Sequence, residues 1–236
     1  MTALLGLATR LGLARLLLIS GAREDEGDLA EFADASFAGG VDIMQLRDPS
    51  ADDKALLAAL TVMRKAAQRY QGLVSVYESG PLASEFQADL LHLPERGYTA
   101  AKARGYLHEW ALVGRSCHSR EQVDAALADP DVNYLTVGPV FGGLTPDSGL
   151  DLVRYAATVA PPSDASAKPW FAVGGITAGT LDKVLSAGAR RIAVSRAVTA
   201  AGNPEAAAIS LKDRLRHAWN SDPAMANLTL QVFKLQ

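Results

Sequence analysis

The sequence predicts an α/β fold, a single-domain (β/α)8 TIM barrel, and three observations lead to this prediction. Eight short apolar runs alternate with helical segments along the 236 residues, which is typical of parallel βαβ units. The stronger runs are nearly continuous in Val, Ile and Leu, as in parallel strands that helices cover on the outside. Eight such units favour a closed barrel over an open sheet, because closure removes both sheet edges.

Each expected strand is followed by a segment with helical composition. In chain order the strands cover residues 14–20, 41–47, 73–78, 90–93, 112–118, 134–140, 170–175 and 192–196. Alanine-rich helices are expected at residues 52–70, 120–128, 177–186 and 204–217, among others. Ser119 and Thr177 stand where a helix N-cap is expected, since their hydroxyls can accept an N–H of the first turn.

We expect one domain over residues 1–236, with the barrel at about 14–217 and a C-terminal extension at 218–236. Barrels of this kind commonly need about 200–250 residues, and no linker or low-complexity tract divides the chain. Residues 227–235 alternate polar and apolar side chains. This end is expected to cover a flank of the barrel, to pair with a second subunit, or to dock loosely.

Composition narrows the functional class. A formal net charge of −3 provides no basic field for nucleic acid or an anionic membrane. The single cysteine, Cys117, rules out an intrachain disulfide framework and suits a reducing compartment. Arg10 and Arg15 interrupt the apolar start of the chain, which stays below the roughly 18 apolar residues of a membrane helix. We therefore expect a cytoplasmic protein that acts on a small molecule, with no nucleic-acid or membrane partner.

Polar residues at the C-terminal ends of the strands are the candidates for binding, because barrels of this class place ligands there. Strand alternation puts Gln45 and Arg47 on one side of the second strand, with Met44 and Leu46 on the other. An inward Gln and Arg suit an anionic or heteroaromatic ligand. A structural ion pair of Arg47 with a neighbouring carboxylate is an equally weighted alternative.

The fifth strand ends with Ser116 and His118 on one face and Cys117 on the other. A histidine at a barrel mouth is suited to carrying a proton near neutral pH. A structural role is the alternative for His118, and its polar neighbour Ser116 favours the functional one. Cys117 is expected to be a packed thiol, because no cationic group is evidently aimed at it.

A phosphate site is expected after the seventh and eighth strands, the usual place in such barrels. Gly174 and Gly175 would let the backbone approach an anion, and Ser195 and Arg196 follow the eighth strand. A tight turn is the alternative for the glycine pair. The Gly- and Pro-rich loop at residues 138–149, which contains Thr145, is expected to be a mobile flap or an ordinary exposed loop. No metal site is expected, since the histidines lack ligand spacing: His92, His108, His118 and His217.

Four segments together resemble the thiamine phosphate synthase/TenI superfamily. They are GVDIMQLR at 40–47, GRSCHS at 114–119, VGPVF at 137–141 and AVGGIT at 172–177. The resemblance implies a barrel, and a homodimer, that handles the phosphorylated thiazole half of thiamine. It assigns the thiazole phosphate to the Gly174-Gly175 turn with Ser195 and Arg196. The same resemblance assigns the ring pocket to Gln45, Arg47 and Ser116, and it adds Thr145 as a substrate-binding residue.

The sequence also departs from the synthase pattern where that pattern holds Mg²⁺ and a pyrophosphate. Pro49 and Pro146 stand at two lysine positions, and Gly97 stands at an aspartate position. Tyr77 and Glu78 stand where synthases have an Asn-Asp pair. A single carboxylate without an adjacent lysine is a poor site for Mg²⁺ and pyrophosphate.

From these departures we expect a TenI-type thiazole tautomerase, an isomerase without metal or cofactor in which His118 moves a proton and Ser116 orients the ring. A first alternative is a divergent thiamine phosphate synthase, a transferase that couples thiazole phosphate to hydroxymethylpyrimidine pyrophosphate. Only that alternative would use Mg²⁺, with Glu78 as a ligand. The second alternative is a non-catalytic phosphate-binding barrel.

Overall fold

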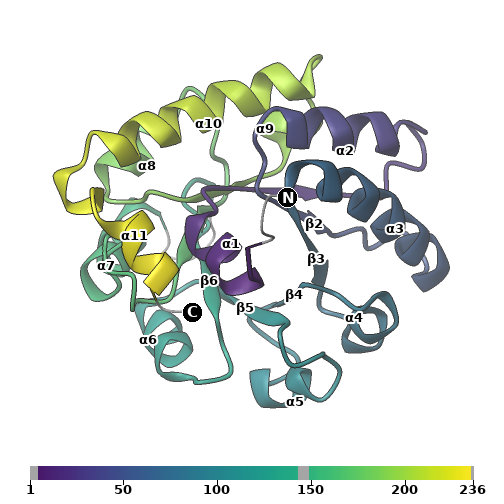
Figure 1. The fold of residues 1–236 in the computed structure, drawn as a ribbon, viewed down its shortest axis with the longest axis horizontal. Helices are drawn as coiled ribbons and strands as arrows, with labels where there is room; N and C mark the ends of the chain where they lie inside the picture. Colours follow the sequence, from purple (N-terminus) through teal and green to yellow (C-terminus); the bar gives the residue numbers. More distant parts are fainter. Residues whose placement is uncertain (1–4, 143–148, 235–236) are drawn as a thin grey trace.

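The computed structural model describes residues 5–142 and 149–234, and in these residues eight parallel strands close into a barrel (Figure 1). The strands are β1 (Leu16–Ser20), β2 (Ile43–Leu46), β3 (Leu73–Tyr77), β4 (Leu90–Leu93), β5 (Leu112–Cys117), β6 (Tyr134–Val137), β7 (Trp170–Val173) and β8 (Ile192–Val194). Each strand pairs with the next along the chain, and β1 also pairs with β8. The predicted (β/α)8 TIM barrel is confirmed.

Helices lie around the outside of the barrel (Figure 1). They are α1 (Leu7–Leu13), α2 (Leu29–Ala38), α3 (Asp53–Tyr70), α4 (Gly80–Phe86), α5 (Ala100–Arg104), α6 (Arg120–Ala128), α7 (Leu150–Val159), α8 (Leu181–Ser186), α9 (Arg196–Thr199), α10 (Pro204–Asn220), the 3-10 helix η1 (Pro223–Met225) and α11 (Leu228–Lys234). Within the described part of the chain, no helix is both long enough and apolar enough to cross a membrane.

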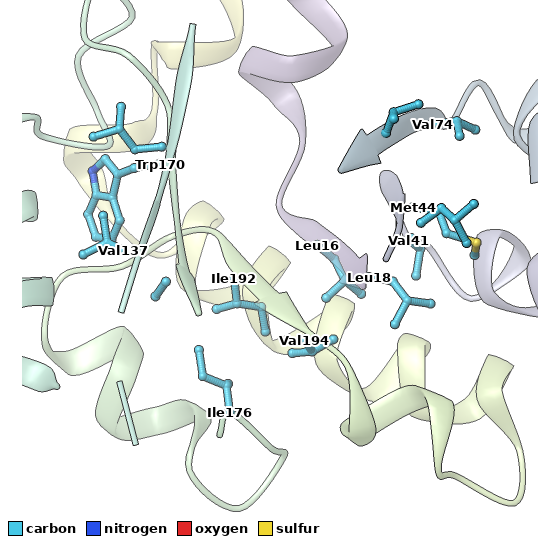
Figure 2. Close-up of a cluster of buried hydrophobic side chains, with 14 of the residues drawn as sticks. Leu16, Leu18, Val41, Met44, Val74, Val137, Trp170, Ile176, Ile192 and Val194 are labelled. Atoms are coloured by element: carbon cyan, nitrogen blue, oxygen red, sulfur yellow. The ribbon is translucent and has the colours of Figure 1, made fainter. Parts of the chain in front are cut away.

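Alternation along the strands separates two apolar layers. The outward side chains pack under the helices, as Leu16, Leu18 and Met44 do in Figure 2. The inward side chains fill the barrel itself, and this inner layer contains Leu17, Ile43, Leu73, Leu90, Leu112, Tyr134, Phe171 and Ala193. Leu11 of α1 packs against the inner layer and closes the N-terminal end of the barrel. The opposite end, where the strands finish, stays available for a site.

Two helix starts test the expected N-caps. The side chain of Ser119 accepts a hydrogen bond from the Gln122 N–H at the start of α6, as expected. The expectation for Thr177 is wrong, because α8 begins only at Leu181. The Thr177 N–H donates instead to Oγ1 of Thr180 at 2.9 Å, which makes residues 177–180 a turn ahead of the helix.

The C-terminal segment packs at the closed end of the barrel. Helix α10 runs to Asn220, and η1 and α11 follow it. Buried residues of these elements form an apolar cluster of their own, which consists of Trp219, Met225, Leu228 and Val232. Helices α11 and α1 contact each other, and a methyl group added to Gly12 would lie 3.0 Å from Cγ1 of Val232 (Figure 1).

Candidate functional site

A cleft of about 700 Å³ opens at the C-terminal ends of the strands, between β7, β8 and β2. Its lining residues are Ile19, Arg47, Pro49, residues 173–177 and residues 193–197. The cleft therefore brings together five of the residues that the sequence nominated: Arg47, Gly174, Gly175, Ser195 and Arg196. It is the natural candidate for the binding of an anionic ligand.

The glycine pair has a clear structural cause. Gly174 and Gly175 have φ angles of 107° and 64°, which favour glycine. A Cβ on Gly174 would lie 2.6 Å from Cα of Pro139, so a side chain there would collide with the loop after β6. That loop is held against β7 by a hydrogen bond from the Val140 N–H to the Val173 carbonyl, at 2.8 Å. The two glycines thus allow the loops after β6 and β7 to pack against each other beside the cleft.

Ser195 and Arg196 mark the point where the chain leaves β8 and enters α9. The Ser195 carbonyl accepts the N–H groups of Val198 and Thr199 at 2.9 and 3.0 Å. An ideal strand would point Ser195 and Arg196 in opposite directions. Because the strand ends at Val194, both residues are exposed and both line the cleft.

A second cavity of about 320 Å³ adjoins the cleft and shares Arg47 and Pro49 with it. It lies against β2, β3, α3 and α4, and its walls are mostly apolar. Polar residues that line it include Asp48, Tyr77 and Glu78. Asp48 already accepts a hydrogen bond from the Ala22 N–H at 2.9 Å and two from Ser50, and these bonds hold the pKa of its carboxyl below the usual value.

Gln45 lies on the inner face of β2, while Met44 and Leu46 belong to the layer under the helices. Its side chain is only 2% exposed, and among the described residues no group donates a hydrogen bond to its Oε1. The structure therefore separates Gln45 from Arg47, which lines both cavities. Of the two residues that strand alternation predicted on one face, only Arg47 lines the cleft.

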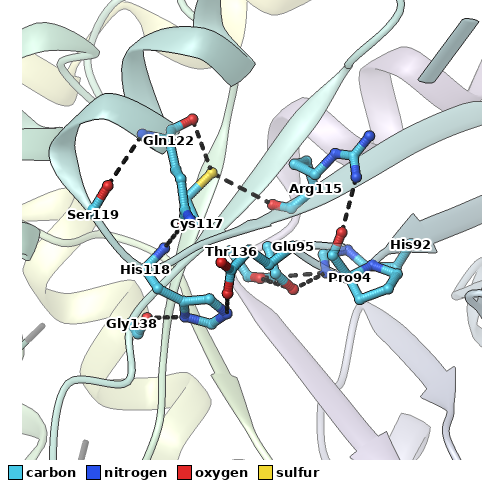
Figure 3. Close-up of polar contacts among 11 residues, drawn as sticks. His92, Pro94, Glu95, Arg115, Cys117, His118, Ser119, Gln122, Thr136 and Gly138 are labelled. Carbon is cyan, nitrogen blue, oxygen red and sulfur yellow. Dashed lines mark hydrogen bonds and ion pairs between the residues drawn. The ribbon is translucent and has the colours of Figure 1, made fainter. Parts of the chain in front are cut away.

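Ser116 and His118 follow the same face of β5 but have different partners. Oγ of Ser116 lies 3.0 Å from Nε2 of His92. Nδ1 of His118 lies 2.5 Å from the Gly138 carbonyl oxygen, and its Nε2 lies 3.9 Å from the Glu95 carboxylate (Figure 3). Since a carbonyl can only accept, Nδ1 of His118 carries the proton of that bond.

Sequence reasoning missed His92, which the inner face of β4 directs into the barrel. Its ring is 2% exposed, and Nδ1 lies 3.2 Å from the Tyr134 hydroxyl. Burial, together with the charges of Arg115 and Arg47, lowers the pKa of His92 to about 3. The signal was available in the alternation of Leu90 and His92, which places both on the side facing the barrel axis.

Two further nominated positions give different outcomes. Cys117 points away from the barrel axis into the layer under the helices, and burial raises the pKa of its thiol to about 12. It is a packed thiol, as expected. Thr145 lies outside the described residues.

Two comparisons of the sequence with known proteins agree on one family. A family model described as thiamine monophosphate synthase matches residues 16–198. A thiamine-phosphate synthase of Thermobifida fusca is 46% identical over 213 residues, which cover 89% of this chain and 95% of that protein. One from Mycobacterium marinum is also 46% identical, over 88% of this chain and 97% of its own length. A solved thiamine phosphate pyrophosphorylase of Pyrococcus furiosus has the same fold, with a TM-score of 0.76, 23% identity and coverage of 90% of this chain and 99% of that one.

These relatives contradict the expected tautomerase. The expectation rested on a few altered positions at the loops, such as Pro49 and Gly97. The relatives share 42–46% identity over most of the chain and are named as synthases. The isomerase assignment is therefore wrong, and the transferase alternative is the one that the relatives favour.

Proposed function

The chain belongs to the thiamine monophosphate synthase family, and on that premise we propose that it joins thiazole phosphate to hydroxymethylpyrimidine pyrophosphate with release of pyrophosphate. One observation carries the proposal beyond family membership. The 700 Å³ cleft and the 320 Å³ cavity adjoin each other and share Arg47 and Pro49 as a common wall. A reaction between two substrates needs two neighbouring binding volumes, and an isomerase acting on one small molecule needs only one.

The thiazole phosphate belongs in the larger cleft. Its phosphate would meet the backbone of Gly174 and Gly175, the Ser195 hydroxyl and the Arg196 guanidinium, which all line that cleft. Backbone N–H groups and guanidinium groups are the donors that phosphate oxygens prefer. The ring would then extend toward Arg47 on the opposite wall.

The pyrimidine substrate belongs in the adjoining cavity, with its pyrophosphate at the shared wall. Arg47 borders both volumes, so its guanidinium can face the pyrophosphate as negative charge develops on the departing group. The apolar walls from Leu46, Val76 and Leu82 would exclude water from the reacting carbon. The role of Arg47 is thus to orient both substrates and to stabilise the leaving group.

The family implies a magnesium ion, and the described residues do not provide a site for it on their own. No group of three or more His, Cys, Asp or Glu side chains suited to a metal occurs among them. Asp48 is occupied by N–H donors, while Glu78 and Glu95 line different cavities. Gly97 stands at a position where the resemblance implies an aspartate. No step of the proposal therefore passes through the metal.

The proposal is tested by turnover of the purified protein with both substrates, comparing the wild type with Arg47→Ala and Arg216→Ala. Arg216 is an exposed arginine of α10 that pairs with Asp213, so it controls for the loss of a surface charge. We expect thiamine phosphate from the wild type and the control, and at least a tenfold loss of kcat/KM in Arg47→Ala. Equal activity of all three proteins would remove Arg47 from the mechanism. A homodimer is also proposed, and light scattering in solution tests it.

A further inference from the structure

His118 joins the end of β5 to the β6 loop, which is defined here as residues 138–141. Nδ1 of His118 donates to the Gly138 carbonyl oxygen at 2.5 Å, and its backbone N–H donates to Oε1 of Gln122 at 2.6 Å (Figure 3). The Gly138 N–H in turn donates to the Cys117 carbonyl at 3.1 Å. Because a carbonyl can only accept, the direction of the bond from His118 is fixed. The side chain of His118 therefore holds the start of the β6 loop against β5.

The other side of the β6 loop packs on the turn that follows β7. The Val140 N–H donates to the Val173 carbonyl at 2.8 Å. The Phe141 N–H donates to the Gly174 carbonyl at 3.1 Å. A Cβ added to Gly138 would collide with the Val173 carbonyl oxygen, so the loop and the turn are in close contact. Packing this dense transmits a displacement to its neighbours, so a shift of the β6 loop moves the turn as well.

The two bonds from the β6 loop also orient the N–H groups of the glycine pair. In a trans peptide the carbonyl and the N–H lie in one plane and point in opposite directions. The bond that holds the Val173 carbonyl therefore turns the Gly174 N–H away from the β6 loop. The bond that holds the Gly174 carbonyl does the same for the Gly175 N–H.

The N–H groups of both glycines are suited to an anion. Within residues 5–142 and 149–234, no main-chain carbonyl accepts the N–H of Gly174 or Gly175. Both glycines line the 700 Å³ cleft. Successive backbone N–H groups that point into a concave surface bind anions, and such bonds weaken steeply when their angle changes. The affinity for a phosphate in this cleft therefore depends on how the β6 loop is held.

We propose that His118 is a positioning residue, which acts through the β6 loop to aim the N–H groups of Gly174 and Gly175 at the phosphate of the thiazole substrate. The proposal rests on the proposed function, because that function places this phosphate in the cleft. His118 does not line the cleft itself, so it makes no contact with the phosphate. Only its Nδ1–H is needed for this role. Its Nε2 lies 3.9 Å from the Glu95 carboxylate, which is on the other side of the ring.

Calorimetry with thiazole phosphate tests the proposal in His118→Leu, His118→Asn and Glu95→Gln. The Asn amide places an N–H near the position of Nδ1–H, whereas Leu has no donor. Glu95→Gln is the matched control, since it changes the partner of Nε2 alone. We expect His118→Leu to raise Kd about fivefold, as for the loss of one hydrogen bond, and the other two variants to stay within twofold of the wild type. An unchanged Kd in folded His118→Leu, or an equal rise in His118→Asn, would overturn the proposal.

Steady-state kinetics separate positioning from a merely structural role. In His118→Leu we expect KM for thiazole phosphate to rise about fivefold, with kcat and the KM for hydroxymethylpyrimidine pyrophosphate within twofold of the wild type. A general loss of folded protein would lower kcat and leave both KM values unchanged. That result, or an equal rise in both KM values, would overturn the proposal.

The tautomer of His118 provides a readout that needs neither ligand nor turnover. In protein labelled with 15N-histidine at pH 8.5, the histidine signal that disappears in His118→Asn should carry its proton on Nδ1, as shown by long-range 1H–15N spectra. A neutral ring with its proton on Nε2 could not donate to Gly138, and it would overturn the proposal. A wild-type protein that binds thiazole phosphate and forms no thiamine phosphate would contradict the proposed function alone.

Discussion

The guanidinium carbon of Arg47 lies 4.7 Å from the centre of the Tyr77 ring. Both residues border the 320 Å³ cavity, and Arg47 also borders the larger cleft. A guanidinium over an aromatic face is attracted by the ring quadrupole. Tyr77 therefore holds Arg47 at the wall between the two proposed substrate sites, at a position where the resemblance implies an asparagine.

The stacking of Arg47 predicts different effects for two substitutions of Tyr77. Tyr77→Leu removes the ring, and we expect KM for the pyrimidine substrate to rise about twofold to fivefold, the value of an exposed cation–π contact. Tyr77→Phe keeps the ring and should match the wild type. Steady-state kinetics check this, and an equal rise in Tyr77→Phe would assign the effect to the hydroxyl instead.

Gly174→Ala should destabilise the fold. The new Cβ would lie 2.6 Å from Cα of Pro139, at a φ of 107°. Strain and clash together should lower the free energy of unfolding by about 2–5 kcal/mol, measured by chemical denaturation.

Gly27→Ala is the matched control for Gly174→Ala, because Gly27 has a φ of 65° and nothing within 4 Å of its added Cβ. It should cost only the backbone strain, about 1–2 kcal/mol. If Gly174→Ala costs no more than Gly27→Ala, the contact with the β6 loop does not constrain position 174.

Arg196→Ala should weaken the binding of thiazole phosphate. A charge-assisted bond from the guanidinium to phosphate is worth roughly 1.5–3 kcal/mol. Calorimetry with thiazole phosphate alone measures the change, with Arg216→Ala as the surface control. Unchanged affinity in Arg196→Ala would mean that Arg196 lines the cleft without contacting the phosphate.

His92 should make the fold sensitive to acid. Its pKa is about 3 in the folded chain and about 6.5 when unfolded, so between these values the unfolded state binds more protons. The contribution of neutral His92 to the free energy of unfolding is fully present above pH 6.5, and it is lost as the pH falls toward 3. Between pH 7 and pH 5 the loss should be about 2 kcal/mol.

Denaturation of His92→Gln at the two pH values checks this linkage. The difference between pH 7 and pH 5 should shrink by about 2 kcal/mol relative to the wild type. The exposed His217 provides the control, and His217→Gln should keep the wild-type difference. The same difference in His92→Gln and the wild type would show that His92 is not responsible.

The sequence predicted the barrel because apolar runs mark buried parallel strands directly. The strand predicted at residues 90–93 matches β4 of the structure. The strands predicted at 134–140 and 170–175 are too long, because β6 ends at Val137 and β7 ends at Val173, where the loops beside the cleft begin. Strand ends depend on local backbone angles, which hydrophobicity does not report. The start of α8 was missed for a similar reason, since the turn at Thr177–Thr180 depends on a side-chain bond.

Site residues that directly follow a strand were predicted from their positions in the sequence. Contacts that depend on how two strands pair were missed. Gly174 and Arg196 follow strand ends and line one cleft, as their positions in the chain implied. The contact of His92 with Ser116 depends on how β4 and β5 pair, with His92 opposite Gly114, and no local pattern reports that pairing. Likewise, the Gly138 carbonyl that binds His118 comes from another loop.

Whether this barrel joins two substrates is decided by measuring the formation of its two products. Purified protein is incubated with thiazole phosphate, hydroxymethylpyrimidine pyrophosphate and magnesium chloride, and thiamine phosphate and pyrophosphate are quantified by 31P NMR. Both products should form in equal amounts, and neither should form when one substrate is omitted. Binding of both substrates without any thiamine phosphate would contradict it.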